Sequence, residues 1–233
     1  MVYSDLEVVQ FTVDLFKQRS ERDKQHKVGA SNISNPCTRH LAHDLLGTPE
    51  QESKYWMGAK IGTAIHSFLE NAMAVSDDKT FADAIIEKKI TLGELPEYGT
   101  VSSKPDLVLP HARQLLDWKT SSRAKVKKLQ NLVAGLKDDE ESKYTLQKYV
   151  GQAQLYAWGM NQAGIPVERI TIVFINRDGT TDTDTWAYGV DYNEAFAKAL
   201  WTRLENLWAE LQAGAHPDNY PNNKHCFECN MNL

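Results

Sequence analysis

The chain has 233 residues, of which 42% are hydrophobic and 24% are charged, a composition typical of a soluble globular protein. Its net charge of −5 does not attract nucleic acid over the whole surface, although clustered basic residues can do so locally. No apolar run is long enough to span a bilayer, and the N-terminus lacks the basic and apolar regions of a signal peptide. Three cysteines argue against a disulfide framework. The length suits one domain, so we expect a single domain over residues 1–233. From the missing membrane and targeting segments we expect a cytoplasmic protein with no membrane partner.

Two helices are predicted near the N-terminus. Apolar residues at spacings of three to four, separated by charged residues, indicate a helix over residues 5–25. Ser34 or Asn35 is expected to cap a second helix, which has Pro36 in its first turn and ends at Gly47.

A third helix, predicted over about residues 54–75, carries Gly62, His66 and Glu70 on one face, because residues four apart are neighbours on a helix. The small Gly62 lets the helix approach a sheet closely, and the imidazole of His66 is able to reach a metal. A lone histidine on a helix is more often structural than a ligand. Its spacing from Glu70, together with the strands that follow, favours a ligand here.

Strands follow the third helix. Alternating hydrophobicity predicts a strand over residues 83–92, and a turn is expected from Gly93 to Gly99. Two short apolar strands are then predicted at residues 107–109 and 115–116, paired antiparallel across a turn.

This antiparallel pairing brings Asp106 and Asp117 together at one end of a sheet. Two carboxylates that close repel each other unless a cation lies between them, so the pair indicates a divalent-metal site. Lys119 lies two residues after Asp117 and therefore on the same face of the strand. Because an ammonium group beside a metal is suited to stabilising charge on a phosphoryl group, the three residues indicate hydrolysis of a phosphodiester.

A basic stretch comes directly after these strands and leads towards a loop at residues 137–141. Its side chains either form a solvated charged face or belong to a loop that contacts nucleic-acid phosphates. The candidate contacts are Arg123, Lys125, Lys127 and Lys128.

The rest of the chain alternates between helices and strands. Gln152 and Tyr156 lie four residues apart and share one face of the first helix in this part. The remaining elements are predicted as helices over about residues 143–163 and 192–213 and as strands over residues 168–176 and 184–190.

Taken together, these motifs resemble those of the RecB-like branch of the PD-(D/E)xK nucleases. The resemblance rests on four motifs in the family's order and covers about residues 55–160. The motifs are Gly62-x-x-x-His66-x-x-x-Glu70, Pro105-Asp106, Asp117-Trp118-Lys119-Thr120 and Gln152-x-x-x-Tyr156.

The resemblance implies an α/β fold with a restriction-endonuclease-like core, in which helices flank a central mixed β-sheet. It also implies that Lys119 is the catalytic lysine, that Gln152 and Tyr156 position substrate and active site, and that Glu70 orients a ligand or tunes a second metal. The implied ligands of a magnesium or manganese ion are His66, Asp106, Asp117 and the carbonyl group of Trp118.

The cysteines resemble those of a subset of this family that includes AddB-type proteins and CRISPR-adaptation nucleases. In that subset one N-terminal and three C-terminal cysteines hold an iron–sulfur (4Fe-4S) cluster. Three of the four places are filled here, by Cys37, Cys226 and Cys229.

The fourth ligand and the identity of this metal are left open by the sequence. His40 completes a set of three cysteines and one histidine, which suits structural zinc. His43 and His225 are other candidates, and three free thiols are the remaining alternative. In either metal-bound case, residues 30–47 and 216–233 form a cysteine-based clamp on the domain.

The resemblance and the motifs together predict a metal-dependent DNA nuclease, and an exonuclease rather than an endonuclease. DNA ends or single strands are the expected partner, in recombination, repair or phage DNA metabolism. A recombination protein or a second copy of the chain is left open as a protein partner. The alternative is a catalytically weak subunit that binds nucleic acid or acts as a scaffold in a larger recombination or adaptation complex.

Overall fold

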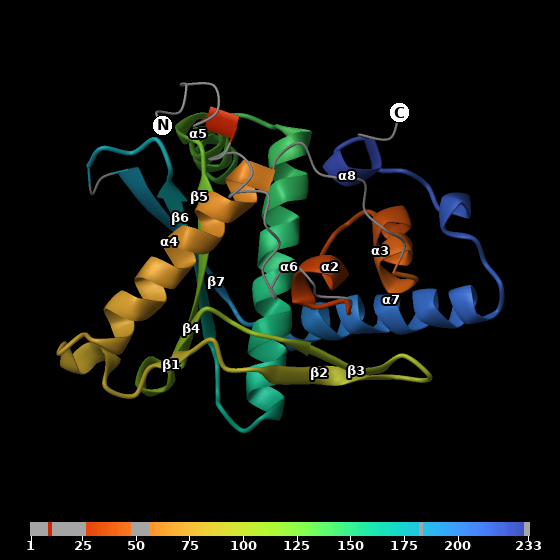
Figure 1. Cartoon of the computed structure of the whole chain (residues 1–233), viewed down its shortest axis with the longest axis horizontal. Coiled ribbons are helices and arrows are strands. Elements are labelled where there is room, and N and C mark those ends of the chain that lie inside the picture. The colour runs from red at the N-terminus through yellow and green to blue at the C-terminus, as the bar shows by residue number, and fades with distance from the viewer. Residues whose placement is uncertain (1–8, 11–26, 48–55, 182–183, 231–233) are drawn as a thin grey trace, which may run out of the picture.

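A five-stranded sheet lies at the centre of the computed structural model, which describes residues 9–10, 27–47, 56–181 and 184–230 (Figure 1). Residues 9 and 10 are helical, and the rest of the helix expected over residues 5–25 lies outside the described residues. In sheet order, the strands are β1 (Ile85–Ile86), β4 (Leu107–Leu109), β5 (Gln114–Ser121), β6 (Arg169–Asn176) and β7 (Thr185–Asp191).

The sheet is mixed, as the sequence predicts. β5 and β6 run parallel, whereas the other neighbouring strands are antiparallel. The strands predicted over residues 168–176 and 184–190 are confirmed to within one residue at each end. In β6 every second side chain is buried, among them Ile170, Ile172 and Phe174, because period-two alternation directs them to one face.

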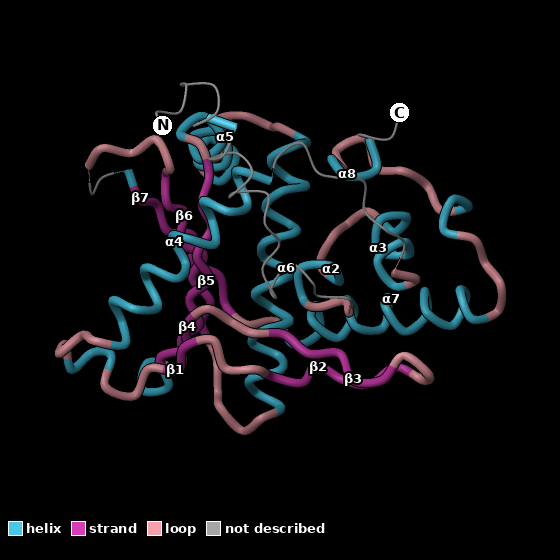
Figure 2. Tube along the Cα trace, viewed as in Figure 1, coloured by secondary structure: helices cyan, strands magenta, loops and turns pink. Residues whose placement is uncertain are grey.

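Helices cover both faces of the sheet, which Figure 2 shows nearly edge-on between α4 and α6. On one face Leu107, Leu109 and Trp118 pack with Leu69 and Met73 of α4 (Trp56–Ala74). On the other face the core joins the sheet to α6 (Glu140–Gln162) and α7 (Glu194–Gln212). The predicted helices over residues 54–75, 143–163 and 192–213 are therefore confirmed in the described part of the chain.

The remaining elements lie around this three-layered centre. A separate hairpin, β2 (Ile90–Leu95) and β3 (Gly99–Ser103), runs beside α6 (Figure 1). The other helices are α2 (Ala30–Ile33), α3 (Thr38–Leu45), α5 (Arg123–Val133) and α8 (Phe227–Asn230), with short 3-10 helices at Lys79–Phe81, Pro110–Ala112 and Pro217–Asn219.

The predicted cap of the second helix is wrong. The chain forms α2, turns, and begins α3 with Cys37 as the N-cap, so Pro36 precedes the helix instead of lying in its first turn. The side chain of Asn35 is used in the turn, where Oδ1 accepts hydrogen bonds from the Cys37 N–H (2.9 Å) and the Tyr144 hydroxyl (2.6 Å). The predicted end is confirmed, because Gly47 adopts a φ of 62° directly after the helix.

The single strand predicted over residues 83–92 is also wrong, because the chain divides it between β1 and β2. Glu87, with a φ of 44°, turns the chain out of the central sheet. The turn expected from Gly93 to Gly99 is shorter, since Gly93 lies inside β2. A Cβ atom at Gly93 would lie 2.3 Å from the indole ring of Trp201, so the glycine leaves space for this ring. That contact joins residues far apart in the sequence, which local alternation does not reveal.

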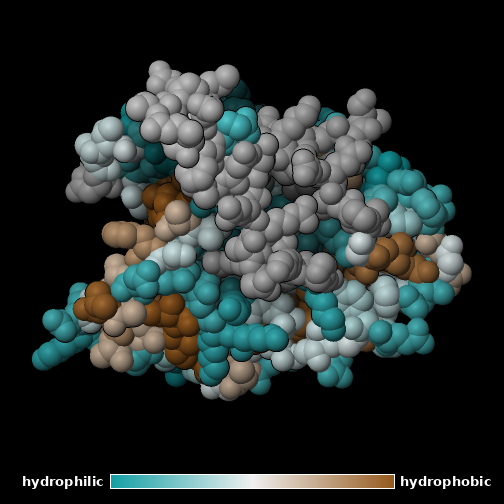
Figure 3. Space-filling model, viewed as in Figure 1, coloured by the Kyte–Doolittle hydropathy of each residue, from teal (hydrophilic) through white to brown (hydrophobic). Residues whose placement is uncertain are grey.

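The outward side of α4 is apolar and exposed, and brown and tan surface is visible over this helix in Figure 3. Its exposed side chains include Met57, Ile61 and Phe68, and Val75, directly after the helix, is exposed too. The position of α4, and with it His66, is therefore set mainly by its packing on the sheet. Within the described residues, no helix combines the length and the apolar character needed to cross a membrane.

Candidate active site

The two acidic residues of the predicted site lie side by side, Asp106 directly before β4 and Asp117 within β5. Leu107 pairs with Leu116 in the antiparallel register, so the residues just beyond them, Asp106 and Asp117, face each other. Asp106 Oδ2 accepts a hydrogen bond of 2.7 Å from the backbone N–H of Trp118. Both aspartates are buried, and Asp117 is completely inaccessible to solvent. The structure thus brings together the carboxylates that the sequence pairs.

His66 reaches this pair from α4. Gly62 lies one turn earlier on the helix, and a Cβ atom there would lie 3.2 Å from Thr120 Oγ1, so the glycine allows the close approach to β5 expected from the sequence. His66 Nδ1 lies 3.3 Å from Asp106 Oδ1, and its ring stands edge-on to that of Trp118. The hydrogen bond to Asp106 raises the pKa of His66 above its ordinary value, despite the opposing effect of burial.

Asp117 and Lys119 form a buried ion pair on the α6 side of β5. Lys119 Nζ lies 3.0 Å from Oδ1 and 2.8 Å from Oδ2 of Asp117, and it donates its hydrogen bond to Oδ1. Burial raises the pKa of Asp117 to about 6, and the charge of Asp106 acts in the same direction. Burial lowers the pKa of Lys119, but the nearby negative charge of Asp117 raises it more, so the ammonium stays protonated.

Gln152 and Tyr156 lie on the face of α6 that covers this pair. The side-chain amide of Gln152 donates a hydrogen bond of 2.7 Å to the Tyr156 hydroxyl, and both residues are buried. Burial raises the pKa of Tyr156, so its hydroxyl remains neutral. Glu70 lies on α4 one turn after His66 and is partly buried. Its side chain therefore belongs to the His66 side of the site.

The sequence did not single out Tyr149, which is also part of the site. Its ring lies beneath Lys119, with Nζ 5.3 Å from the ring centroid. Tyr149 is seven residues before Tyr156 on α6, so the two rings lie on the same face, two turns apart. The spacing of seven residues between Tyr149 and Tyr156 is the sequence signal that places Tyr149 in the site.

The donor set of the site fits a hard divalent cation, because two carboxylates and an imidazole are ligands that magnesium and manganese accept. Asp117 Oδ2 is buried, and its neighbour is the ammonium of Lys119 at 2.8 Å, so this oxygen already faces a positive charge. Among the described residues, however, the ligand atoms of His66, Asp106 and Asp117 do not all lie within 4.8 Å of one another. A cation bound here would compete with Lys119 for the Asp117 carboxylate.

The basic stretch forms the helix α5 rather than the loop considered in the sequence analysis, because Ser122 caps it by accepting a hydrogen bond from the Lys125 N–H. Two of its four candidate contacts are paired with acids. Arg123 Nη2 lies 2.9 Å from Asp184 Oδ1, and Lys128 Nζ lies 3.2 Å from Glu141 Oε2. Lys125 is partly buried and Lys127 is exposed.

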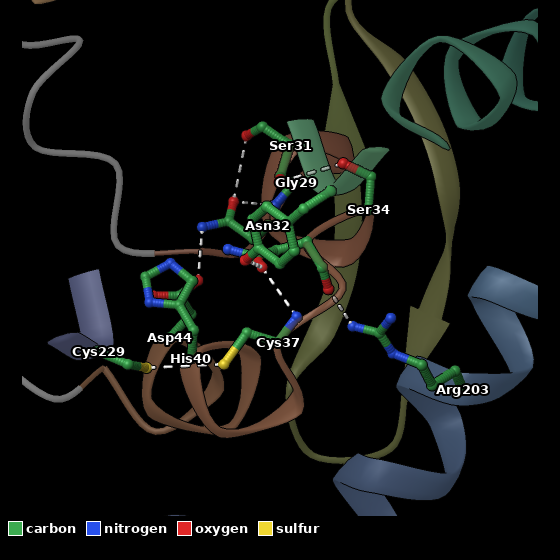
Figure 4. A network of polar contacts seen from close by, with 11 residues as sticks. Gly29, Ser31, Asn32, Ser34, Cys37, His40, Asp44, Arg203 and Cys229 are labelled. Atoms are coloured by element: carbon green, nitrogen blue, oxygen red, sulfur yellow. Dashed lines mark hydrogen bonds and ion pairs between the residues drawn. The ribbon is translucent and has the colours of Figure 1, made fainter. Parts of the chain in front are cut away.

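The three cysteines form a second cluster, although Cys37 is separated from the other two by nearly the whole chain. Cys37 Sγ lies 3.7 Å from Cys229 Sγ (Figure 4). The sulfur atoms of Cys37, Cys226 and Cys229 all lie within 4.8 Å of one another. The hydrogen bond with Cys226 lowers the pKa of Cys37 to about 5, and the same contact raises the pKa of Cys226. This contact favours the thiolate of Cys37, and the thiolate is the form of cysteine that binds metals.

The histidines near this cluster are placed differently. His40 Nε2 lies 3.4 Å from Asp44 Oδ2, and no nitrogen of His40 belongs to the compact group of sulfur atoms. His43 pairs with Asp218 at 3.3 Å. His225 Nε2 is buried and accepts or donates no hydrogen bond among the described residues. The three thiols fit zinc or an iron–sulfur cluster by donor type, and His225 lies beside one of them in the sequence.

Comparison with known proteins supports the fold. No protein-family model matches the chain, and no curated protein sequence matches it. A phage-related exonuclease from Haemophilus somnus 129PT is 13% identical, with a TM-score of 0.50 over 80% of this chain and 95% of the other.

Two further solved structures resemble the chain. A protein from Eubacterium rectale named as an exonuclease is 12% identical, with a TM-score of 0.50 over 93% of this chain and 94% of its own. The alkaline exonuclease of Laribacter hongkongensis is 16% identical, with a TM-score of 0.49 over 81% and 89% of the two chains. With the mixed sheet described above, the two structures with a TM-score of 0.50 support the expected α/β, restriction-endonuclease-like fold.

Proposed function

We propose that the chain is a metal-dependent deoxyribonuclease of the RecB-like PD-(D/E)xK type, and an exonuclease that acts on DNA ends or single strands. The observation that carries this proposal is the convergence of His66, Asp106, Asp117 and Lys119 around the middle of β5 and the start of β4. The exonuclease mode is supported by the names of the proteins that share the fold. The reaction is hydrolysis of a phosphodiester by an activated water molecule.

Each residue of the site has a role in this proposal. His66, Asp106 and Asp117 hold magnesium or manganese, with the carbonyl group of Trp118 as a further ligand. The bound ion supplies Lewis-acid activation of water and of the phosphoryl oxygen. Glu70 lies on the helix that carries His66 and orients that ligand.

The remaining groups act through charge and position. Because Lys119 stays protonated, its role is to stabilise negative charge on the phosphate in the transition state rather than to remove a proton from water. Gln152 and Tyr156 pack over the Asp117–Lys119 pair and keep these two side chains of β5 in position. In recombination, repair or phage DNA metabolism, the substrate is DNA with free ends.

We also propose that residues 1–233 form a single nuclease domain, in which residues 30–47 and 216–233 are joined by a structural metal. Cys37, Cys226 and Cys229 supply three of its ligands, and zinc or a 4Fe-4S cluster fits this set. For zinc, a histidine completes the set. His40 requires a change from its present pairing with Asp44 before it can do so.

The proposal is tested with end-labelled single- and double-stranded DNA, incubated with and without manganese. The wild-type protein is expected to shorten the DNA from its ends only when manganese is present. Lys119→Ala and Asp117→Asn should each lower the cleavage rate by at least about a hundredfold. Lys198→Ala, at an exposed position of α7, is the matched control and should cleave like the wild type.

Two outcomes would contradict the proposal. Cleavage that persists in both site variants would separate the reaction from these residues. DNA binding without cleavage in any divalent metal would instead assign the chain to the alternative considered from the sequence, a binding or scaffold subunit.

A further inference from the structure

Beside the proposed active site, basic side chains gather at the edge where β5 and β6 end. The parallel register pairs Ser121 with Asn176, and the next amide, that of Arg177, donates a hydrogen bond of 2.8 Å to the Ser121 carbonyl. Lys125 lies in the first turn of α5, directly after β5. Lys119 lies on β5 itself, so all three cations emerge from the same edge of the sheet.

Lys148 of α6 completes this group. It precedes Tyr149, whose ring lies beneath Lys119. Burial lowers the pKa of Lys125, and the charges of Lys148, Lys128 and Arg177 lower it further, so these groups are electrostatic neighbours. The charges of Lys119 and Arg177 likewise oppose the effect of burial on the pKa of Tyr149. The basic group is therefore continuous with the proposed active site.

Two of these cations lack an acidic partner. Within the described part of the chain, neither the ammonium of Lys125 nor the guanidinium of Arg177 forms an ion pair or a hydrogen bond. Other cations nearby are paired, as Arg123 is with Asp184 and Lys128 with Glu141. Glu141 is the acid that attracts Lys125 from a distance, and its carboxylate is already engaged.

The guanidinium of Arg177 also lies close to the start of α4. A Cβ atom at Gly58, near the start of α4, would lie 3.0 Å from Arg177 Nη1. The guanidinium is exposed and lies between the start of α4 and the end of β6. Repulsion between the cations of Lys125 and Arg177 opposes folding, and an anion bound between them would remove this repulsion.

We propose that Lys125, Lys148 and Arg177 form a subsite for a backbone phosphate of nucleic acid, adjoining the phosphate at Lys119. The subsite rests on the proposed function, because it assumes a nucleic-acid strand at the active site. The planar guanidinium of Arg177 binds two phosphate oxygens at once, and the two lysines add point charges. The strand then leaves the active site across the ends of β5 and β6.

The test measures binding of a fluorescent single-stranded DNA at several salt concentrations, without added divalent metal so that the strand stays intact. Lys125→Gln and Arg177→Gln should each weaken binding and reduce the slope of log affinity against log salt by about 0.7. Lys198→Gln removes the same charge from exposed α7 and should retain the wild-type slope. Thermal unfolding of each variant checks that the fold is unchanged.

The DNA is used with and without a terminal phosphate. An equal loss of slope on both strands would identify an internal phosphate as the ligand, and a loss confined to the phosphorylated strand would identify a terminal one. If both variants keep the wild-type slope while the wild-type protein cleaves DNA, the subsite is refuted and the proposed function stands. If the wild-type protein neither binds nor cleaves DNA, both fail together.

Discussion

The carboxylate of Asp106 takes the place of a backbone partner for Trp118, whose N–H donates a hydrogen bond of 2.7 Å to Oδ2. β4 begins only at the next residue, so the side chain extends the antiparallel pairing of β4 and β5 by one step. The other oxygen, Oδ1, lies 3.3 Å from His66 Nδ1 on α4. One acidic side chain therefore fixes the helix that carries a proposed ligand to the strand that carries the others.

Manganese affinity should rise with pH. The pKa of Asp117 is raised to about 6 by burial, and that of His66 is raised by its hydrogen bond to Asp106. Both groups must lose a proton to bind a metal, so protons compete with manganese below these pKa values. Affinity should increase by about tenfold per pH unit for each proton displaced, and level off above both values. Calorimetric titration from about pH 5 to pH 8 measures this, and a pH-independent affinity would argue against these ligands.

A side chain larger than glycine at position 62 should separate α4 from β5. A Cβ atom there would lie 3.2 Å from Thr120 Oγ1, so Gly62→Val moves the helix outward and takes His66 away from Asp106. We expect a loss of about 1–3 kcal/mol in the free energy of unfolding and a fall in manganese affinity.

Thr63→Val is the matched control for this substitution, because it places the same side chain at an exposed position of the same helix. It should leave manganese affinity unchanged. Thermal unfolding and manganese titration of both variants provide the measurement. Wild-type affinity in Gly62→Val would show that the spacing between helix and sheet does not control the site.

The ring of Tyr149 should matter more than its hydroxyl group. Lys119 Nζ lies 5.3 Å from the ring centroid, a geometry in which a cation and an aromatic face attract each other by about 0.5–2 kcal/mol. Tyr149→Leu should therefore lower the single-turnover cleavage rate by about twofold to thirtyfold, whereas Tyr149→Phe keeps the ring and most of the rate. If both substitutions reduce the rate equally, the hydroxyl group is the part that acts.

Loss of one thiol should release the structural metal. Cys229→Ser removes one of three sulfur atoms that lie within 4.8 Å of one another, so the variant should be purified without stoichiometric zinc or iron. Its free energy of unfolding should fall by about 2.7 kcal/mol if the wild-type metal is present at a hundred times its dissociation constant. Elemental analysis and thermal unfolding give these quantities, and Asp117→Asn, which alters the other site, should keep the metal.

The colour of the protein distinguishes the two metals. A brown sample that absorbs near about 400 nm identifies an iron–sulfur cluster, whereas a colourless sample with stoichiometric zinc identifies the alternative. If protein purified anaerobically without chelators contains neither iron nor zinc at a stoichiometric level, the shared site is refuted.

The centre of the site was predictable because its geometry is local. A short turn between two apolar strands sets the antiparallel register, and this register alone places Asp106 beside Asp117. The alternation of β5 likewise puts Asp117 and Lys119 on one face. The spacing of four on α4 predicts that Gly62 and His66 face the same way, and both indeed face the sheet.

Other features depend on contacts that no local pattern contains. Arg177 joins the basic group only because β6 is inserted in parallel beside β5, some fifty residues later in the chain. Gly93 looks like a turn residue in the sequence, yet it lies in a strand beneath Trp201. Ser34 and Asn35 have the chemistry of helix caps, but Asn35 is engaged by Cys37 and Tyr144 instead.

The position of β5 inside the sheet divides the site into two parts that open at different rates. The amides of β5 lie between β4 and β6, so they exchange with solvent hydrogen only when the sheet itself separates. Among the described residues, α4 packs on the sheet with one side and exposes apolar side chains on the other, so its turns can exchange through smaller openings. Asp117 and Lys119 are thus tied to the slowest-opening unit of the fold, whereas His66 belongs to a faster one. The distance between His66 and Asp117 therefore changes whenever α4 opens locally, while β5 stays in the sheet.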